Sequence, residues 1–261
     1  PPAQLYLRGA GDPSLLSAPA VAVVGARSCS AYGRAVARSL GRELAGAGLV
    51  VVSGLARGVD GEAHRGALEA EGATVAVLGC GIDRDYPAAH AELARRIRSR
   101  GLVVSEYEPG VEPAPWRFPA RNRIIAGLCR ATVVVEARER SGALITADFA
   151  LEEGREVLAV PGEITSALSA GTNGLLRLGA APVTGAGDVL ELFGLSLATR
   201  RAVPLGDAAR ALLGPLADGP LTADELLRRA GLAPGDAAAA LTELELAGRV
   251  VLEEGVYRAA V

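Results

Sequence analysis

The chain has 261 residues, half of them apolar, and its 27 basic residues against 30 acidic ones give a net charge of −3. This length allows one large domain, or a medium one and a small one, and the apolar fraction suits an α/β protein. The three cysteines lack CxxC spacing and the two histidines lie far apart, which argues against a disulfide framework and against a metal centre. No run of 18 apolar residues and no basic-then-apolar signal segment occurs, so we expect a cytoplasmic protein with no membrane partner. We also expect no cofactor.

From residue 21 onward, apolar runs alternate with amphipathic stretches. Buried strands are predicted at 21–25, 49–53, 74–78, 102–105, 131–137 and 156–160. Between them, a first helix carries Val36, Leu40 and Leu44 on one face, and later helices end near Ala70 or span 90–100, 121–129 and 142–154. Strands separated by helices of this length form βαβ units. We therefore predict a Rossmann-like, doubly wound, mostly parallel sheet within residues 1–195.

The composition changes near residue 196. Residues 196–206 are predicted to be a linker, and residues 207–261 a separate small domain with helices at 207–217, 222–230 and 235–247. Thr222 and Glu225 have capping-box spacing, and two short strands follow in "GRVVLEEGVYRAA". Three helices and a hairpin predict a winged helix. Its potential groove-reading helix, "PGDAAAALTELELAG", contains acids and no arginine, so we expect protein contacts or stability as its role rather than duplex binding.

Loops after the strands are the candidate binding site, because ligands of open parallel sheets bind beyond the carboxyl ends of the strands. Four such loops combine Gly, Ser or Thr, and several carry arginine: Gly25–Ser28, Ser53–Gly58, Ser141–Thr146 and 170–180. Backbone N–H groups at such turns bind anions. The first loop lacks G-x-G-x-x-G and on its own also fits a plain turn. Together the four loops predict a ligand rich in phosphate.

The stretch "WRFPARNRIIAGL" at 116–128 gathers arginines and aromatic rings. We expect residues 106–120 to form a Pro-rich loop that leads into a helix at Arg121, on the same sheet edge. Arg121 and Arg123 cannot share one face of that helix, so one is expected to reach the ligand while the other braces the loop. Trp116 and Phe118 are either stacking platforms for bases or anchors of the loop.

The ordered motifs of residues 5–185 resemble the DNA-processing protein A (DprA/Smf) family. They are "VAVVGARSCSAYG", "VVSGLARGVDGEAHRGAL", "LGCGIDRDYPAAH", "SEYEPG", "FPARNRIIAGL", "VVVEARERSGALITADFALEEGREVLAVPG" and "GTNGLLRLGA". The resemblance implies a Rossmann-type core that binds single-stranded DNA in a basic pocket and forms a homodimer. It also implies protection of incoming DNA and its delivery to the RecA recombinase in natural transformation, with single-strand-binding protein as a further partner.

The DNA-binding residues implied by the resemblance come from its GARS, SGLARG, FPARNR, SGALIT and GTN motifs. They are Arg27, Ser53, Gly54, Arg57, Phe118, Arg121, Asn122, Arg123, Ser141, Gly142, Thr146 and Asn173. Many members carry Lys in place of Ala120. The loss of that phosphate contact weakens binding unless Arg117 substitutes, so Arg117 joins the expected set. Members often begin with a small helical domain that is missing before Leu5, and the sequence opens at Pro1 rather than Met, so we expect an upstream domain to be absent here.

Two other functions compete with DNA binding. A nucleotide phosphoribohydrolase on a related core needs a "PGGxGTxxE" loop, whereas this chain has "ERSGALITADFALEEG" there. A hydrolytic triad of Ser53, Asp60 and His64 lacks the G-x-S-x-G elbow, and His64 falls within a predicted helix. The winged helix alone is also compatible with a transcription regulator. We therefore expect a binding protein rather than an enzyme.

Overall fold

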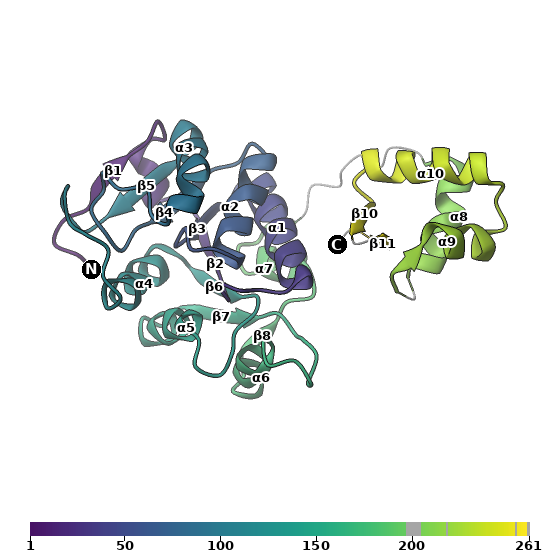
Figure 1. The fold of residues 1–261 in the computed structure, drawn as a ribbon. Coiled ribbons are helices and arrows are strands. Elements are labelled where there is room, and N and C mark those ends of the chain that lie inside the picture. The colour runs from purple at the N-terminus through teal and green to yellow at the C-terminus, as the bar shows by residue number, and fades with distance from the viewer. Residues whose placement is uncertain (197–204, 218, 254, 260–261) are drawn as a thin grey trace. The chain divides into compact units, whose positions relative to one another are not determined.

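The computed structural model describes residues 1–196, 205–217, 219–253 and 255–259. The chain divides into two compact units, Pro1–Ala198 and Thr199–Val261, which Figure 1 shows with their elements labelled. Most of the predicted linker, 197–204, lies outside the described residues. No helix in the described ranges is long and apolar enough to cross a membrane.

The first unit is built on an eight-stranded sheet of order β1-β5-β4-β3-β2-β6-β7-β8. Its strands are β1 (Tyr6–Arg8), β2 (Ala20–Val24), β3 (Val50–Ser53), β4 (Thr74–Val77), β5 (Leu102–Ser105), β6 (Ala131–Val134), β7 (Glu156–Ala159) and β8 (Ala181–Pro182). All neighbouring strands are parallel except β1 and β5. The predicted doubly wound, mostly parallel sheet is thus confirmed. Strand β1 was missed because it is short and lacks a buried apolar run.

Helices cover both faces of this sheet. They are α1 (Ala31–Gly46), α2 (Val59–Glu69), α3 (Ala91–Arg100), α4 (Arg117–Leu128), α5 (Gly142–Glu152), α6 (Ala170–Arg177) and α7 (Ala186–Glu191), with 3-10 turns at Pro13–Leu16 and Ala88–His90. Helices α1, α2, α3 and α7 lie on one face, and α4, α5 and α6 on the other (Figure 1). Alternate residues of β2 therefore enter different cores: Val23 packs in the cluster of Leu40, and Val24 in that of Ile125. Burial on both faces explains the continuous apolar strands of the sequence.

The chain order creates a switch point in the middle of the sheet. From β2 the chain runs outward through β3, β4 and β5, and then returns to place β6 on the other side of β2. The connections after β2 and β6 consequently leave toward opposite faces. A crevice at the carboxyl ends of such a strand pair is the usual ligand site of an open α/β sheet.

Two predicted boundaries in this unit were wrong. Helix α4 begins at Arg117 rather than Arg121, so the predicted 106–120 loop ends at Trp116. Pro119 suggested a loop, but it lies in the first turn, where backbone N–H groups have no partner within the helix and proline is tolerated. Strand β6 ends at Val134 rather than at residue 137. The chain has left the sheet by then, since the Ala137 N–H donates to the Leu168 carbonyl.

The second unit is a winged helix, as predicted. Helices α8 (Asp207–Leu216), α9 (Ala223–Ala230) and α10 (Pro234–Leu246) accompany a three-stranded sheet of order β10-β11-β9, made of β9 (Leu221–Thr222), β10 (Val250–Glu253) and β11 (Val256–Ala259). Leu212, Leu226 and Leu244 form its core. The capping box of Thr222 and Glu225 is present at the start of α9. Strand β9 was not predicted, because two residues give no periodic signal.

Candidate functional site

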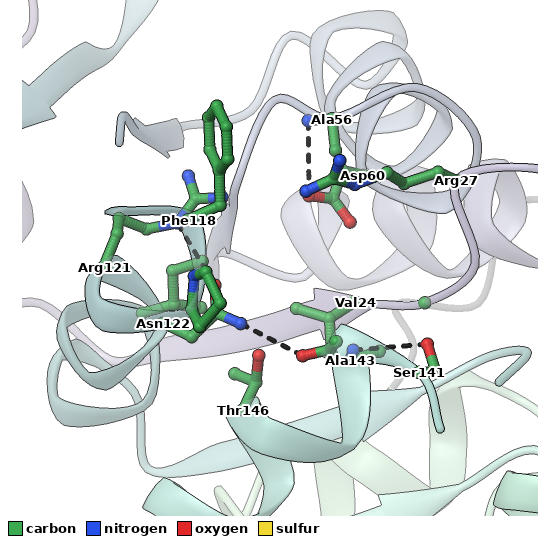
Figure 2. Close-up of a pocket in the computed structure, with 14 residues that line it drawn as sticks. Val24, Arg27, Ala56, Asp60, Phe118, Arg121, Asn122, Ser141, Ala143 and Thr146 are labelled. Carbon is green, nitrogen blue, oxygen red and sulfur yellow. Dashed lines mark hydrogen bonds between the residues drawn. The ribbon is translucent and has the colours of Figure 1, made fainter. Parts of the chain in front are cut away.

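A cavity of about 240 Å³ lies at the switch point of the sheet. The end of β2, the loops after β2 and β3, the first turn of α2, one face of α4 and the start of α5 surround it (Figure 2). Its lining residues are Val24, Gly25, Arg27, Ala56, Asp60, Phe118, Pro119, Arg121, Asn122, Ile125, Ser141, Gly142, Ala143 and Thr146. Most come from the motifs selected in the sequence, although those motifs are far apart along the chain.

Two buried charges hold the floor of the cavity together. Asp60 Oδ2 accepts hydrogen bonds from the backbone N–H groups of Gly54, at 3.1 Å, and Ala56, at 3.3 Å. Arg121 Nη1 donates to the carbonyl of Gly54, at 2.9 Å, and to that of Val77. A side chain on Gly54 would place its Cβ 2.5 Å from Arg121 Nη2, so only glycine fits there. These contacts fasten the β3 loop and strand β4 to helix α4.

Burial perturbs both charges. Removal from water lowers the pKa of Arg121 to about 10, an effect that the nearby Asp60 carboxylate opposes. Burial likewise raises the pKa of Asp60, and the Arg121 guanidinium opposes that shift. The nitrogen atoms of Arg121 and the carboxylate oxygens of Asp60 form no ion pair within 4.0 Å. They therefore interact through space across the floor, and Arg121 stays cationic at neutral pH.

One wall of the cavity is cationic and aromatic. The exposed guanidinium of Arg27 lies 5.3 Å from the ring centroid of Phe118. The Phe118 ring also stacks against the ring of Tyr86, with ring centroids 5.4 Å apart and ring planes at 21°. Gly58 has a φ of 75° and would place a Cβ 2.3 Å from the Ala26 carbonyl oxygen, so the β3 loop packs directly on the β2 loop. This packing holds Arg27 at the rim, where its guanidinium and the Phe118 ring form a cationic and aromatic surface for a ligand.

The opposite wall is the N-terminus of α5. Ser141 caps this helix, and its hydroxyl accepts from the Ala143 N–H at 3.3 Å. Asn122 of α4 donates to the Gly142 carbonyl at 3.1 Å and so joins the two helices (Figure 2). Free N–H groups and the helix dipole make such a terminus attractive to anions. The cavity thus offers positive potential from two sides.

The other predicted binding residues do not line this cavity in the described part of the chain. They are Ser53, Gly54, Arg57, Arg117, Arg123 and Asn173. Arg57 is exposed beside the lining residue Ala56. Arg117 lies 4.6 Å from the Trp116 ring centroid and 5.2 Å from that of Tyr107.

Three members of that set have other partners. Ser53 is fully buried, and its hydroxyl donates to the Val23 carbonyl at 2.7 Å. Arg123 pairs with Glu106, at the base of the loop that precedes α4, so it braces that loop while Arg121 faces the cavity. The amide of Asn173 exchanges two hydrogen bonds with the backbone of Gly162, at 3.0 and 3.2 Å.

The residue that the sequence most clearly undervalued is Asp60, which was weighed only as a member of a triad. That triad does not form. His64 lies on the buried face of α2, and its Nδ1 is hydrogen-bonded to Thr74 Oγ1 of β4 at 2.7 Å. Burial lowers the pKa of His64 to about 3. A usable signal was present: a carboxylate shortly after a glycine-rich turn is a natural acceptor for the free N–H groups of that turn.

Fold and site together define a Rossmann-like α/β protein with a cationic pocket at its switch point, followed by a winged helix. The family model of DNA recombination-mediator protein A matches residues 1–194, and that of the DprA winged helix domain matches residues 196–255. The chain therefore belongs to the DNA recombination-mediator protein A family.

Relatives and solved structures agree with this assignment. The DNA processing protein DprA of Streptococcus pneumoniae is 50% identical over 74% of this chain and 67% of its own length. An X-ray structure of that protein has a TM-score of 0.68 and 49% identity, covering 72% of this chain and 65% of that one. A Helicobacter pylori DNA processing protein A, described for its single-stranded DNA binding mode, has a TM-score of 0.68 and 33% identity, covering 74% and 87%. Against two Mycobacterium tuberculosis relatives, each 46% identical over 92% of this chain, the chain spans 64% of their length.

Proposed function

We propose that this chain binds single-stranded DNA in the switch-point cavity. The observation that carries this proposal is the pairing of Arg27 and Phe118 on one wall with the α5 N-terminus on the other. Phosphates suit the cationic groups, and bases suit the ring and the guanidinium plane. A space of about 240 Å³ has room for a single base and none for a double helix. The DNA-binding mode described for the Helicobacter pylori relative supports this assignment.

The wider role follows from the family. We propose that the chain acts as a binding protein rather than an enzyme, protects incoming DNA, and delivers it to the RecA recombinase during natural transformation. Single-strand-binding protein is the further expected partner, and the cytoplasm the expected location. Homodimerisation through the core is consistent with β8 at the sheet edge and with Leu178 beside it, which is 87% exposed.

The winged helix contributes little to DNA capture in this proposal. Helix α10 carries Asp236, Glu243 and Glu245 and contains no arginine or lysine, so it offers no cation to a phosphate. We assign this domain to protein contacts or to stability. Tight duplex binding by the full chain that disappears when residues 205–261 are removed would contradict the assignment.

A competition experiment tests the proposed function. The full chain is saturated with a labelled single-stranded oligonucleotide, and unlabelled single strand or duplex of the same length is added while anisotropy is followed. We expect the single strand to displace the probe at much lower concentration than the duplex, with little dependence on sequence. Equal displacement by the duplex, or no binding of the probe at all, would contradict the proposal.

A further inference from the structure

A second aromatic and cationic cluster lies outside the cavity, where helix α4 begins. Trp116, the only tryptophan of the chain, is the N-cap residue of this helix and is 63% exposed. The Arg117 guanidinium lies over its ring, 4.6 Å from the centroid, and also over the ring of Tyr107, at 5.2 Å. Arg117 additionally donates a hydrogen bond to the Glu112 carbonyl. The indole therefore rests on a fixed support, while the rest of its surface is open to solvent.

The charge at this surface decides which class of ligand fits. The carboxylates of Glu106 and Glu112 are paired with other arginines, Arg123 and Arg84, and Arg117 itself has no ion pair among the described residues. A purely apolar partner packed on the indole would desolvate this guanidinium without compensating its charge. A flat ring that carries a negative group satisfies both the indole and the guanidinium, and a nucleotide is such a group.

Trp116 cannot stack on the same base as Phe118. The two residues lie two positions apart in α4, which turns their side chains about 200° from each other around the helix axis. Phe118 accordingly lines the cavity and Trp116 does not, in the part of the chain that the structure describes. The rise between them along the helix is only about 3 Å. The indole therefore lies just outside the cavity, within reach of a strand that enters it.

We infer that Trp116 is a separate stacking platform, which binds an unpaired base that flanks the nucleotides held in the cavity. The inference rests on the proposed binding of single-stranded DNA and adds the path of the strand, which leaves the cavity over the start of α4. The flanking base lies on the open side of the indole, and its phosphate lies near Arg117. Trp116 is then a base platform rather than an anchor of the loop, in agreement with its exposure of 63%.

The intrinsic fluorescence of the full chain tests this platform, because Trp116 is its only tryptophan. An unlabelled oligothymidylate is titrated into the chain while tryptophan emission is followed, and the affinity for the same oligomer is measured separately by anisotropy with a labelled strand. A base stacked on the indole quenches its emission. We expect saturable quenching with the same midpoint as the anisotropy titration. Binding with unchanged emission would overturn the inference and leave the proposed function intact.

Variants measure what the platform contributes. Trp116→Ala should bind the oligothymidylate about 5-fold to 150-fold more weakly, the equivalent of about 1–3 kcal/mol for one stacked base, with an unchanged salt dependence. Trp116→Phe keeps a ring and should retain most of the affinity, and Leu246→Ala, which removes an exposed apolar side chain of α10, should bind like the parent chain. Unweakened binding by Trp116→Ala would overturn the inference. Failure of the parent chain to bind any oligothymidylate would instead refute the proposed function, and the inference with it.

Discussion

Replacement of Arg121 by alanine is expected to destabilise the first unit rather than only to remove a DNA contact. Arg121 is 4% exposed, and its guanidinium donates to the carbonyl of Gly54, in the loop after β3, and to that of Val77, at the end of β4. Its removal leaves the Asp60 carboxylate buried without its nearest cation. An uncompensated buried carboxylate, together with two buried carbonyls that lose their donor, costs about 3–5 kcal/mol, a large share of the 5–15 kcal/mol typical of a domain.

Urea unfolding followed by circular dichroism measures this loss. We expect Arg121→Ala to lower the free energy of unfolding by about 3–5 kcal/mol, and Arg96→Ala, an exposed arginine, by less than about 0.5 kcal/mol. Combining Arg121→Ala with Asp60→Asn should restore part of the stability, because no buried charge is then left uncompensated. A loss below about 1 kcal/mol in Arg121→Ala would refute the structural role given to this residue.

Three further outcomes are expected. The pKa of His64 is about 3 in the folded state, below its ordinary value of 6.5. On acidification the unfolded state therefore binds the proton first. The stability of the first unit is full above pH 6.5 and falls as the pH drops toward 3. Between pH 7.5 and pH 5 the chain should lose about 2 kcal/mol, and His64→Asn should remove that part of the pH dependence in urea titrations. Phe118→Ala should weaken single-strand binding by about 1–3 kcal/mol with little change in salt dependence, measured by anisotropy; an unchanged affinity would assign the ring to loop packing. Thr222→Ala should destabilise the second unit by about 1 kcal/mol in thermal unfolding through loss of its cap on α9, and an unchanged melting transition would contradict this.

The sheet was predictable because its strands are buried on both faces. All residues of β2 are buried, so the strand has an unbroken apolar signal that no helix face would produce. The elements that were missed carry no such signal. Strand β1 is partly exposed and β9 has two residues, and each is defined by its partner strand rather than by its own sequence.

The candidate site was predictable at the level of loops and less so at the level of side chains. Arg27, Phe118, Asn122 and Ser141 line the cavity because short motifs after strands are brought together at the switch point. Burial is a property of the packed structure, so the sequence could not separate Arg121, which faces the floor, from Arg123, which pairs with Glu106.

For Asp60, the same limit applied. Its capping of the Gly54 and Ala56 N–H groups could have been inferred from its place after the glycine-rich turn. Its burial beside Arg121 depends on the packed structure and is not visible in residue spacing.

The central claim is that a cationic cavity around Arg27 captures the phosphates of single-stranded DNA. The most direct measurement is the affinity for a labelled single-stranded oligonucleotide across a salt series, for the parent chain, Arg27→Ala and Arg96→Ala. We expect the logarithm of the binding constant to fall linearly with the logarithm of salt concentration, with a slope about 0.7 shallower in Arg27→Ala for one lost phosphate contact. Arg96→Ala should match the parent chain. Equal slopes for Arg27→Ala and the parent would contradict the claim and place the DNA elsewhere on the molecule.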